Sequence, residues 1–136
     1  MPEPLSICGL HHIGRNTRRL AESRVFYRDV LGFREIERPN FDFRGAWLYN
    51  YGLQIHLIAK EEPASNSPTG EIQTRSEHLA LFVEDLEGVR QSLEAHGIPY
   101  RTNQIADTGI KQLFFRDPDG HHIEVGAYPP TPPFLS

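Results

Sequence analysis

Apolar and polar residues alternate along several short stretches of the chain, which is the pattern of half-buried β-strands. The clearest stretch covers residues 112–126, where two apolar runs flank the sequence Asp-Pro-Asp-Gly at 117–120. Proline and glycine in this arrangement favour a tight turn. The pattern therefore predicts a β-hairpin whose second strand turns Ile123 and Val125 to one face and Glu124 to the other.

The same patterns predict the remaining elements. Apolar positions three and four residues apart indicate one helix that starts at Asn16 or Thr17 and runs to about residue 31, and a second that starts at Asp85. Gly32 and Gly97 stand where helices commonly end. Further strands are expected at residues 9–14, 33–38, 46–51, 54–59, 77–83 and 100–104, with a hairpin turn at Gly52-Leu53.

The predicted elements occur twice in the same order. His12 precedes a leucine by eight residues and so does His78, while a glycine lies four residues before His56 and four before Glu124. Each half is therefore a βαβββ unit of about fifty residues, and the fold class is α+β. We expect one domain over residues 1–136, divided into a first module (about 9–59), a linker (60–76), a second module (about 77–127) and a proline-rich tail (128–136).

Four polar residues occupy equivalent places in the two modules. His12 and His78 open the first strands, and His56 and Glu124 lie in the last strands. Their aliphatic neighbours face the opposite way, so helices covering the aliphatic face would leave all four on the concave side of the sheet. Three imidazoles and one carboxylate suit a divalent metal ion, which could be zinc, nickel, iron, manganese or cobalt.

The alternatives to this metal site are ordinary ones. A water molecule could replace His56 as a ligand, because one coordination position is often left open. Asp117 and Asp119 are expected to be turn formers rather than functional groups. The other histidines, at positions 11, 96, 121 and 122, are expected at the surface or behind the ligands.

Composition excludes several classes of protein. The net charge is -4 and the 14 basic residues are scattered, which argues against a nucleic-acid or anionic-membrane partner. The single cysteine, Cys8, excludes an intrachain disulfide and a cysteine-based zinc cluster. No apolar run approaches the ~20 residues that cross a bilayer. The first residues lack the order of a signal peptide, so a cytoplasmic location is expected by default.

Several of these motifs together resemble a known family. The segments are His12-Ile-Gly, Phe-Tyr-Arg-Asp-Val-Leu-Gly-Phe at 26–33, His78-Leu-Ala, and Asp-Pro-Asp-Gly at 117–120 followed by Glu124. They resemble the vicinal oxygen chelate superfamily, which includes glyoxalase I, fosfomycin-resistance enzymes, methylmalonyl-CoA epimerase, extradiol dioxygenases and bleomycin-binding proteins. The resemblance covers roughly residues 9–127.

The resemblance implies paired βαβββ modules that form a U-shaped mixed sheet around a metal ion. It implies His12, His56, His78 and Glu124 as the ligands, and homodimers in which modules of two chains complete each site. In glyoxalase I the position of His56 usually carries a glutamate. Its replacement removes one candidate carboxylate base and leaves Glu124 as the candidate catalytic residue.

Three functional hypotheses follow. The leading one is a divalent-metal-dependent lyase or isomerase of the glyoxalase type. It would act on a small oxygen-chelating substrate by Lewis-acid stabilisation of an enediolate or oxyanion, with Glu124 as a ligand or proton carrier. The second is an iron(II) extradiol-type dioxygenase with the same ligands. The third is a small-molecule or drug-sequestering binding protein without catalysis.

Overall fold

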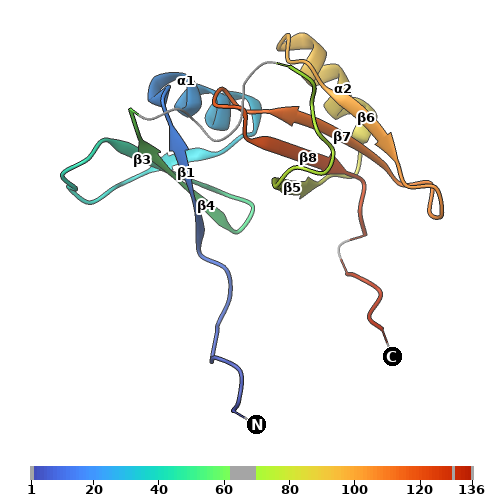
Figure 1. Cartoon of the computed structure of the whole chain (residues 1–136), viewed down its shortest axis with the longest axis horizontal. Helices are drawn as coiled ribbons and strands as arrows, with labels where there is room; N and C mark the ends of the chain where they lie inside the picture. Colours follow the sequence, from blue (N-terminus) through green and yellow to red (C-terminus); the bar gives the residue numbers. More distant parts are fainter. Residues whose placement is uncertain (1, 62–69, 130, 136) are drawn as a thin grey trace. The chain divides into compact units, whose positions relative to one another are not determined.

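The computed structural model contains the same arrangement of strands and helices twice (Figure 1). It describes residues 2–61, 70–129 and 131–135. The chain divides into two compact units, Met1–Pro63 and Ala64–Ser136, and each is described by itself. The predicted α+β class and the predicted βαβββ repeat are confirmed, because each unit forms one four-stranded mixed sheet with the same strand order.

The first unit builds a sheet covered by a helix. Its elements are β1 (His12–Thr17), α1 (Leu20–Val25), a short π-helix η1 (Phe26–Val30), β2 (Arg34–Ile36), β3 (Gly45–Asn50) and β4 (Leu53–Ala59). The strand order is β1-β4-β3-β2, with β1 parallel to β4 and the other pairs antiparallel. Helix α1 contacts β3 and β4. Tyr27 and Phe33 meet edge to face at 6.2 Å in the core, above the fully buried Leu48 and Ile55.

The first helix begins later than the sequence predicts. Thr17 is the last residue of β1, and the helix starts at Leu20 behind Arg19, whose side chain makes no capping hydrogen bond. The Thr17 hydroxyl lies 2.9 Å from the Ser23 hydroxyl and accepts a hydrogen bond from the Arg19 backbone N–H at 3.0 Å. The prediction of a helix start at Asn16 or Thr17 was wrong because the sheet and this buried contact recruit Thr17.

The end of this helical segment is tied to the hairpin between β3 and β4. Gly32 follows the helices with φ 83°, as the sequence predicts. The hairpin turns at Tyr51 and Gly52, whose φ angles of 55° and 75° are those of a type I′ turn. The predicted turn at Gly52-Leu53 was one residue too late. The Tyr51 hydroxyl donates to the Leu31 carbonyl at 2.6 Å, which satisfies an acceptor at the helix end.

The second unit repeats the first with its own core. Its elements are β5 (His78–Phe82), α2 (Leu86–Ala95), β6 (Arg101–Gln104), β7 (Lys111–Arg116) and β8 (His122–Gly126). The order is β5-β8-β7-β6, with β5 parallel to β8. The register places Leu113 beside Val125 and Phe115 beside Ile123, all buried. Helix α2 contacts β7 and buries Leu93.

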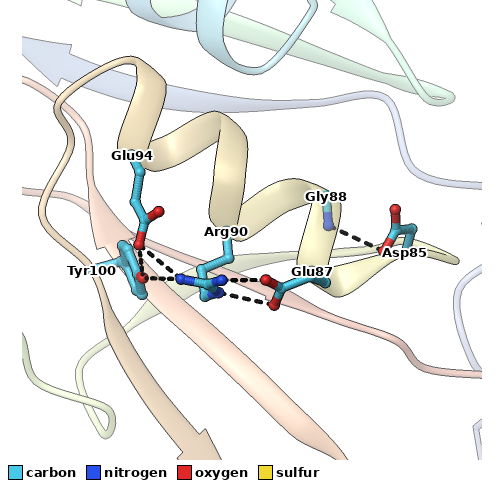
Figure 2. A network of polar contacts seen from close by, with 6 residues as sticks. All are labelled: Asp85, Glu87, Gly88, Arg90, Glu94 and Tyr100. Carbon is cyan, nitrogen blue, oxygen red and sulfur yellow. Dashed lines mark hydrogen bonds and ion pairs between the residues drawn. The ribbon is translucent and has the colours of Figure 1, made fainter.

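A network of charged residues lines the exposed side of α2 (Figure 2). Arg90 pairs with Glu87 one turn earlier and with Glu94 one turn later, the latter at 2.8 Å. The Tyr100 hydroxyl donates to the same Glu94 carboxylate at 2.7 Å, which connects the helix to the residue before β6. Because these side chains are exposed to solvent, the network contributes little to stability.

Residues just before β5 pack within the second unit, to which they belong. Ile72 is buried, and its carbonyl accepts from Arg101 at 2.9 Å. The backbone N–H of Gln73 donates to the imidazole of His122 at 3.0 Å. These residues fall in the predicted linker, of which residues 62–69 lie outside the described part of the chain. None of the helices in the described residues has the length and apolar character that a membrane span requires.

The N-cap of α2 gives a direct test of this fold. The Asp85 carboxylate accepts a hydrogen bond from the Gly88 backbone N–H at 3.1 Å, as predicted. We expect Asp85→Ala to lower the free energy of unfolding by about 1 kcal/mol, because that N–H loses its partner. Urea titration followed by circular dichroism measures the change. Glu84→Ala, at the exposed preceding residue, is the control and should stay within about 0.5 kcal/mol. Equal losses in both variants would contradict the capping role.

Candidate metal centre

Two of the predicted ligands, His12 and His56, meet in the first unit. The parallel register of β1 and β4 aligns His12 with Gln54, which places it on the same face as His56 two residues further on. The two imidazole centroids lie 3.8 Å apart with nearly parallel planes. The indole of Trp47, opposite His56 in the β3–β4 register, stacks on it at 3.9 Å. His56 is thus held between two rings.

The environment of His56 keeps its imidazole neutral. Burial first, and then the neighbouring His12, His11 and Arg38, lower the pKa of His56 to about 4. The Nε2–H of His56 donates to the side-chain oxygen of Gln54 at 2.8 Å, which leaves the lone pair on Nδ1. Metal ions bind neutral imidazole, so protons do not compete for this ligand near neutral pH.

The other two predicted ligands, His78 and Glu124, meet in the second unit. The parallel register of β5 and β8 aligns Ala80 with Glu124, so the carboxylate shares a face with His78. Nε2 of His78 lies 3.2 Å from Oε1 of Glu124. Nδ1 of His78 donates to the Ser76 carbonyl at 2.7 Å. Because a carbonyl only accepts, Nδ1 carries the proton and the lone pair of a neutral His78 faces the carboxylate.

The contact between His78 and Glu124 is stable only with a positive charge between the two atoms. A lone pair and a carboxylate oxygen 3.2 Å apart repel each other unless a proton or a cation lies between them. Two atoms that each bind one ion at about 2.1 Å are themselves separated by about 3 Å. A histidine whose other ring nitrogen donates to a carbonyl is also the usual arrangement of a metal ligand. The pair therefore fits a divalent cation.

A chain of hydrogen bonds orients the Glu124 carboxylate. The side-chain amide of Asn103 donates to Gln112 at 2.6 Å, Gln112 donates to the Tyr128 hydroxyl at 2.7 Å, and that hydroxyl donates to Oε2 of Glu124. Burial, together with the hydrogen bond to Glu124, raises the pKa of Tyr128. The hydroxyl therefore stays protonated and occupies one carboxylate oxygen, while the other faces His78.

Sequence reasoning missed Tyr128, which lies in the predicted tail. The signal that could have found it is Gly126, two residues earlier. A Cβ atom at Gly126 would lie 2.5 and 2.6 Å from ring atoms of Tyr128, so the missing side chain makes room for the ring to fold back over the strand. The glycine is needed for space, and this space lets Tyr128 reach Glu124.

The remaining histidines and turn aspartates differ in burial. His11 and His96 are exposed, but His121 and His122 are buried, which corrects any expectation of a surface position for them. Asp117 forms the predicted turn, since one of its carboxylate oxygens accepts from the backbone N–H groups of Asp119 and His121, both at 2.9 Å. Because that oxygen accepts both hydrogen bonds, Asp117 serves to hold the turn together.

Each unit therefore contributes one pair of donors. Within the described residues, no group of three or more His, Cys, Asp or Glu side chains is positioned to hold a metal ion. The four-ligand site stays a prediction. The donor chemistry fits it, because the pairs offer neutral His56, an anchored His78 and a carboxylate with one oxygen free of Tyr128.

A hollow lies along β2 and β3 at the edge of the first sheet. Its volume is about 520 Å³, and its walls are Arg34, Glu35, Ile36, Glu37, Tyr49 and Asn50. Ile36 lies opposite Trp47 in the β2–β3 register, so the hollow begins beside the ring stack on His56. A volume of this size is typical of sites for small molecules.

Comparisons of the sequence and of the structure with known proteins point to the same family. The sequence model of the Glyoxalase/Bleomycin resistance protein/Dioxygenase superfamily matches residues 9–125. Glyoxylase I 4 of Arabidopsis thaliana is 38% identical over 125 residues, which cover 90% of this chain and 72% of that protein. Metallothiol transferase FosB of Staphylococcus haemolyticus is 29% identical over 128 residues, covering 88% and 83%. The crystal structure of a glyoxalase/dioxygenase from Nostoc punctiforme superposes with a TM-score of 0.74 at 24% identity, covering 95% and 97%.

The contact between Gly126 and Tyr128 is testable by a double-mutant cycle. We expect Gly126→Ala to destabilise the protein by about 1–2 kcal/mol, because the new methyl group displaces the ring and breaks its hydrogen bonds to Gln112 and Glu124. Urea unfolding measures the loss. In a Tyr128→Ala background the same substitution should cost less than about 0.5 kcal/mol, because the ring is already absent. Identical costs in both backgrounds would show that the glycine serves another purpose.

Proposed function

Because the chain belongs to the glyoxalase/bleomycin resistance protein/dioxygenase superfamily, we propose that it is a divalent-metal-dependent enzyme of the glyoxalase type. It acts as a lyase or isomerase on a small substrate that carries two neighbouring oxygen atoms. The observation that carries this proposal is the 3.2 Å approach of His78 Nε2 to Glu124 Oε1, a pair of atoms that a shared metal ion would bridge in place of a proton.

The proposed ligands are His12, His56, His78 and Glu124. When bound, the ion supplies Lewis acidity toward the two substrate oxygens. Each module carries only two of these donors, so four protein ligands require one first module and one second module, from the same chain or from two chains. The proposal therefore includes a homodimer, the assembly common in this superfamily, and a cytoplasmic enzyme that acts on a small molecule.

Glu124 is the proposed proton carrier. It is the only carboxylate of the proposed set, because His56 stands where a second one is common. Tyr128 holds Oε2 and leaves Oε1 on the side of His78. A carboxylate fixed in this way is oriented to take a proton from a substrate carbon and return it to the neighbouring one. Gln112 keeps the Tyr128 hydroxyl pointed at Glu124.

The relatives support the same reading. A protein 38% identical to this chain is named a glyoxylase I, and another relative is named a metallothiol transferase. Both names describe enzymes, and the second includes a metal. The hypothesis of a binding protein without catalysis ranks lower, because the candidate ligands are all present in this sequence.

Metal analysis tests the proposal. Protein prepared without a histidine tag should retain roughly one divalent ion per chain after dialysis. His78→Ala and Glu124→Gln should each lower the metal content below about a tenth of that value, because each removes a ligand or weakens it. His96→Ala, at an exposed histidine outside both donor pairs, is the control and should keep the ion. Negligible metal in the wild-type protein and in all variants would refute the proposal.

Oxygen consumption separates the proposed activity from the dioxygenase alternative. Protein loaded with ferrous iron under anaerobic conditions is mixed with aerated buffer and catechol, and an oxygen electrode follows the reaction. We expect no uptake above that of the Glu124→Gln variant, because the proposed chemistry moves protons and transfers no electrons to oxygen. Stoichiometric uptake with wild-type protein alone would replace the lyase or isomerase assignment by the dioxygenase.

A further inference from the structure

The loop between β2 and β3 carries an arginine whose charge is not neutralised. We call residues 37–44 the Arg38 loop. The guanidinium carbon of Arg38 lies 4.9 Å from the ring centroids of both Phe41 and Phe43. One nitrogen donates to the Phe43 carbonyl at 2.8 Å, while Nε is buried and makes no hydrogen bond. Among the described residues, no ion pair joins Arg38 to an acidic side chain.

The guanidinium of Arg38 packs against the sheet at Gly45. A Cβ atom at Gly45 would lie 3.1 and 3.2 Å from two guanidinium nitrogens and 2.3 Å from the Leu57 carbonyl. The Leu57 carbonyl of the neighbouring strand excludes a side chain at Gly45, and the guanidinium of Arg38 lies over this glycine at the start of β3.

A continuous aromatic surface connects the loop to the candidate ligands. The rings of Phe41 and Phe43 lie 5.1 Å apart and are 45% and 42% exposed. Phe41 approaches Trp47 at 6.0 Å, and Trp47 stacks on His56 at 3.9 Å. All these residues belong to the first unit. A flat ligand on this surface would thus lie between the arginine and the histidine pair.

The exposed rings and the Arg38 guanidinium indicate which kind of ligand this surface would bind. Exposed aromatic rings favour another ring by stacking or edge contacts. An arginine that forms no ion pair favours a carboxylate, which can accept two hydrogen bonds from a guanidinium group. Neither a neutral aromatic nor a small aliphatic acid satisfies both groups. The combination therefore points to a molecule that carries a ring and a carboxylate.

We propose that the Arg38 loop binds an aromatic carboxylic acid as the substrate of this enzyme. The guanidinium of Arg38 pairs with the carboxylate, and Phe41, Phe43 and Trp47 contact the ring. This inference deepens the proposed function and rests on it, because the oxygens to be chelated belong to the same molecule. Recognition by the loop itself needs no metal, so the two ideas are tested separately.

Trp47 reports binding because it is the single tryptophan of the chain. We would titrate the full chain, treated with a chelator, with 3-phenylpropionate, its neutral amide and propionate, and follow the fluorescence of Trp47. The aromatic acid should bind at least about tenfold more tightly than either of the others. Equal affinities for the acid and the amide would overturn the proposal, and so would equal affinities for the aromatic acid and propionate.

Variants of the loop localise the effect. Arg38→Gln should reduce the advantage of the acid over the amide to less than about threefold, and Arg38→Lys should keep part of it. Arg44→Gln, at an exposed arginine of the same loop, is the matched control and should keep the full advantage. An undiminished advantage in Arg38→Gln would refute the role of Arg38.

Two further measurements keep the test independent of folding and of the metal. In the wild-type protein, raising sodium chloride from about 0.05 to 0.5 M should weaken binding of the acid and leave the amide unchanged. A salt response that is the same for both ligands would contradict the proposal. Protein that binds the acid but never retains metal would overturn only the proposed function. Protein that retains metal but does not distinguish acid from amide would overturn only this inference.

Discussion

Parallel pairing between the first and last strands of each module is the constraint on which the site depends. In a parallel pair, aligned side chains share a face, and residues two apart along a strand share it as well. The β1–β4 register therefore brings His12 to the side of His56, and the β5–β8 register brings His78 to the side of Glu124. A shift of one residue in either pair would turn one donor into the aliphatic core.

The same parallel pairing positions different side chains in the two modules. The first holds His56 between two rings, which removes water and keeps the imidazole neutral. The second places a carboxylate at a buried position, where an unpaired charge would be costly. A hydrogen bond from Tyr128 offsets part of this cost, and a proton or cation shared with His78 would offset more of it. The duplicated fold thus supplies two imidazoles from one half and an imidazole with a carboxylate from the other.

Residues outside the strands refine what the strands position. Tyr128 follows β8 and returns to Glu124 over a glycine, and Arg38 follows β2 and packs over another glycine. In both places a glycine lies under the side chain of a polar residue near a candidate ligand: Tyr128 near Glu124, and Arg38 near His56. Loops and strand ends can change without disturbing the sheet, so these are the positions where members of one fold can differ in substrate.

The sequence by itself determined the repeat and the fold class, and it predicted four candidate ligands, because strand alternation and repeat spacing are local patterns. Only the tertiary structure decided which groups support them. Thr17 joins the sheet instead of capping the helix, Tyr51 adopts a positive φ, and Tyr128 reaches back to Glu124. Each of these outcomes depends on a hydrogen bond or a contact between residues that local patterns do not connect, so burial and packing decide them rather than the order of the residues.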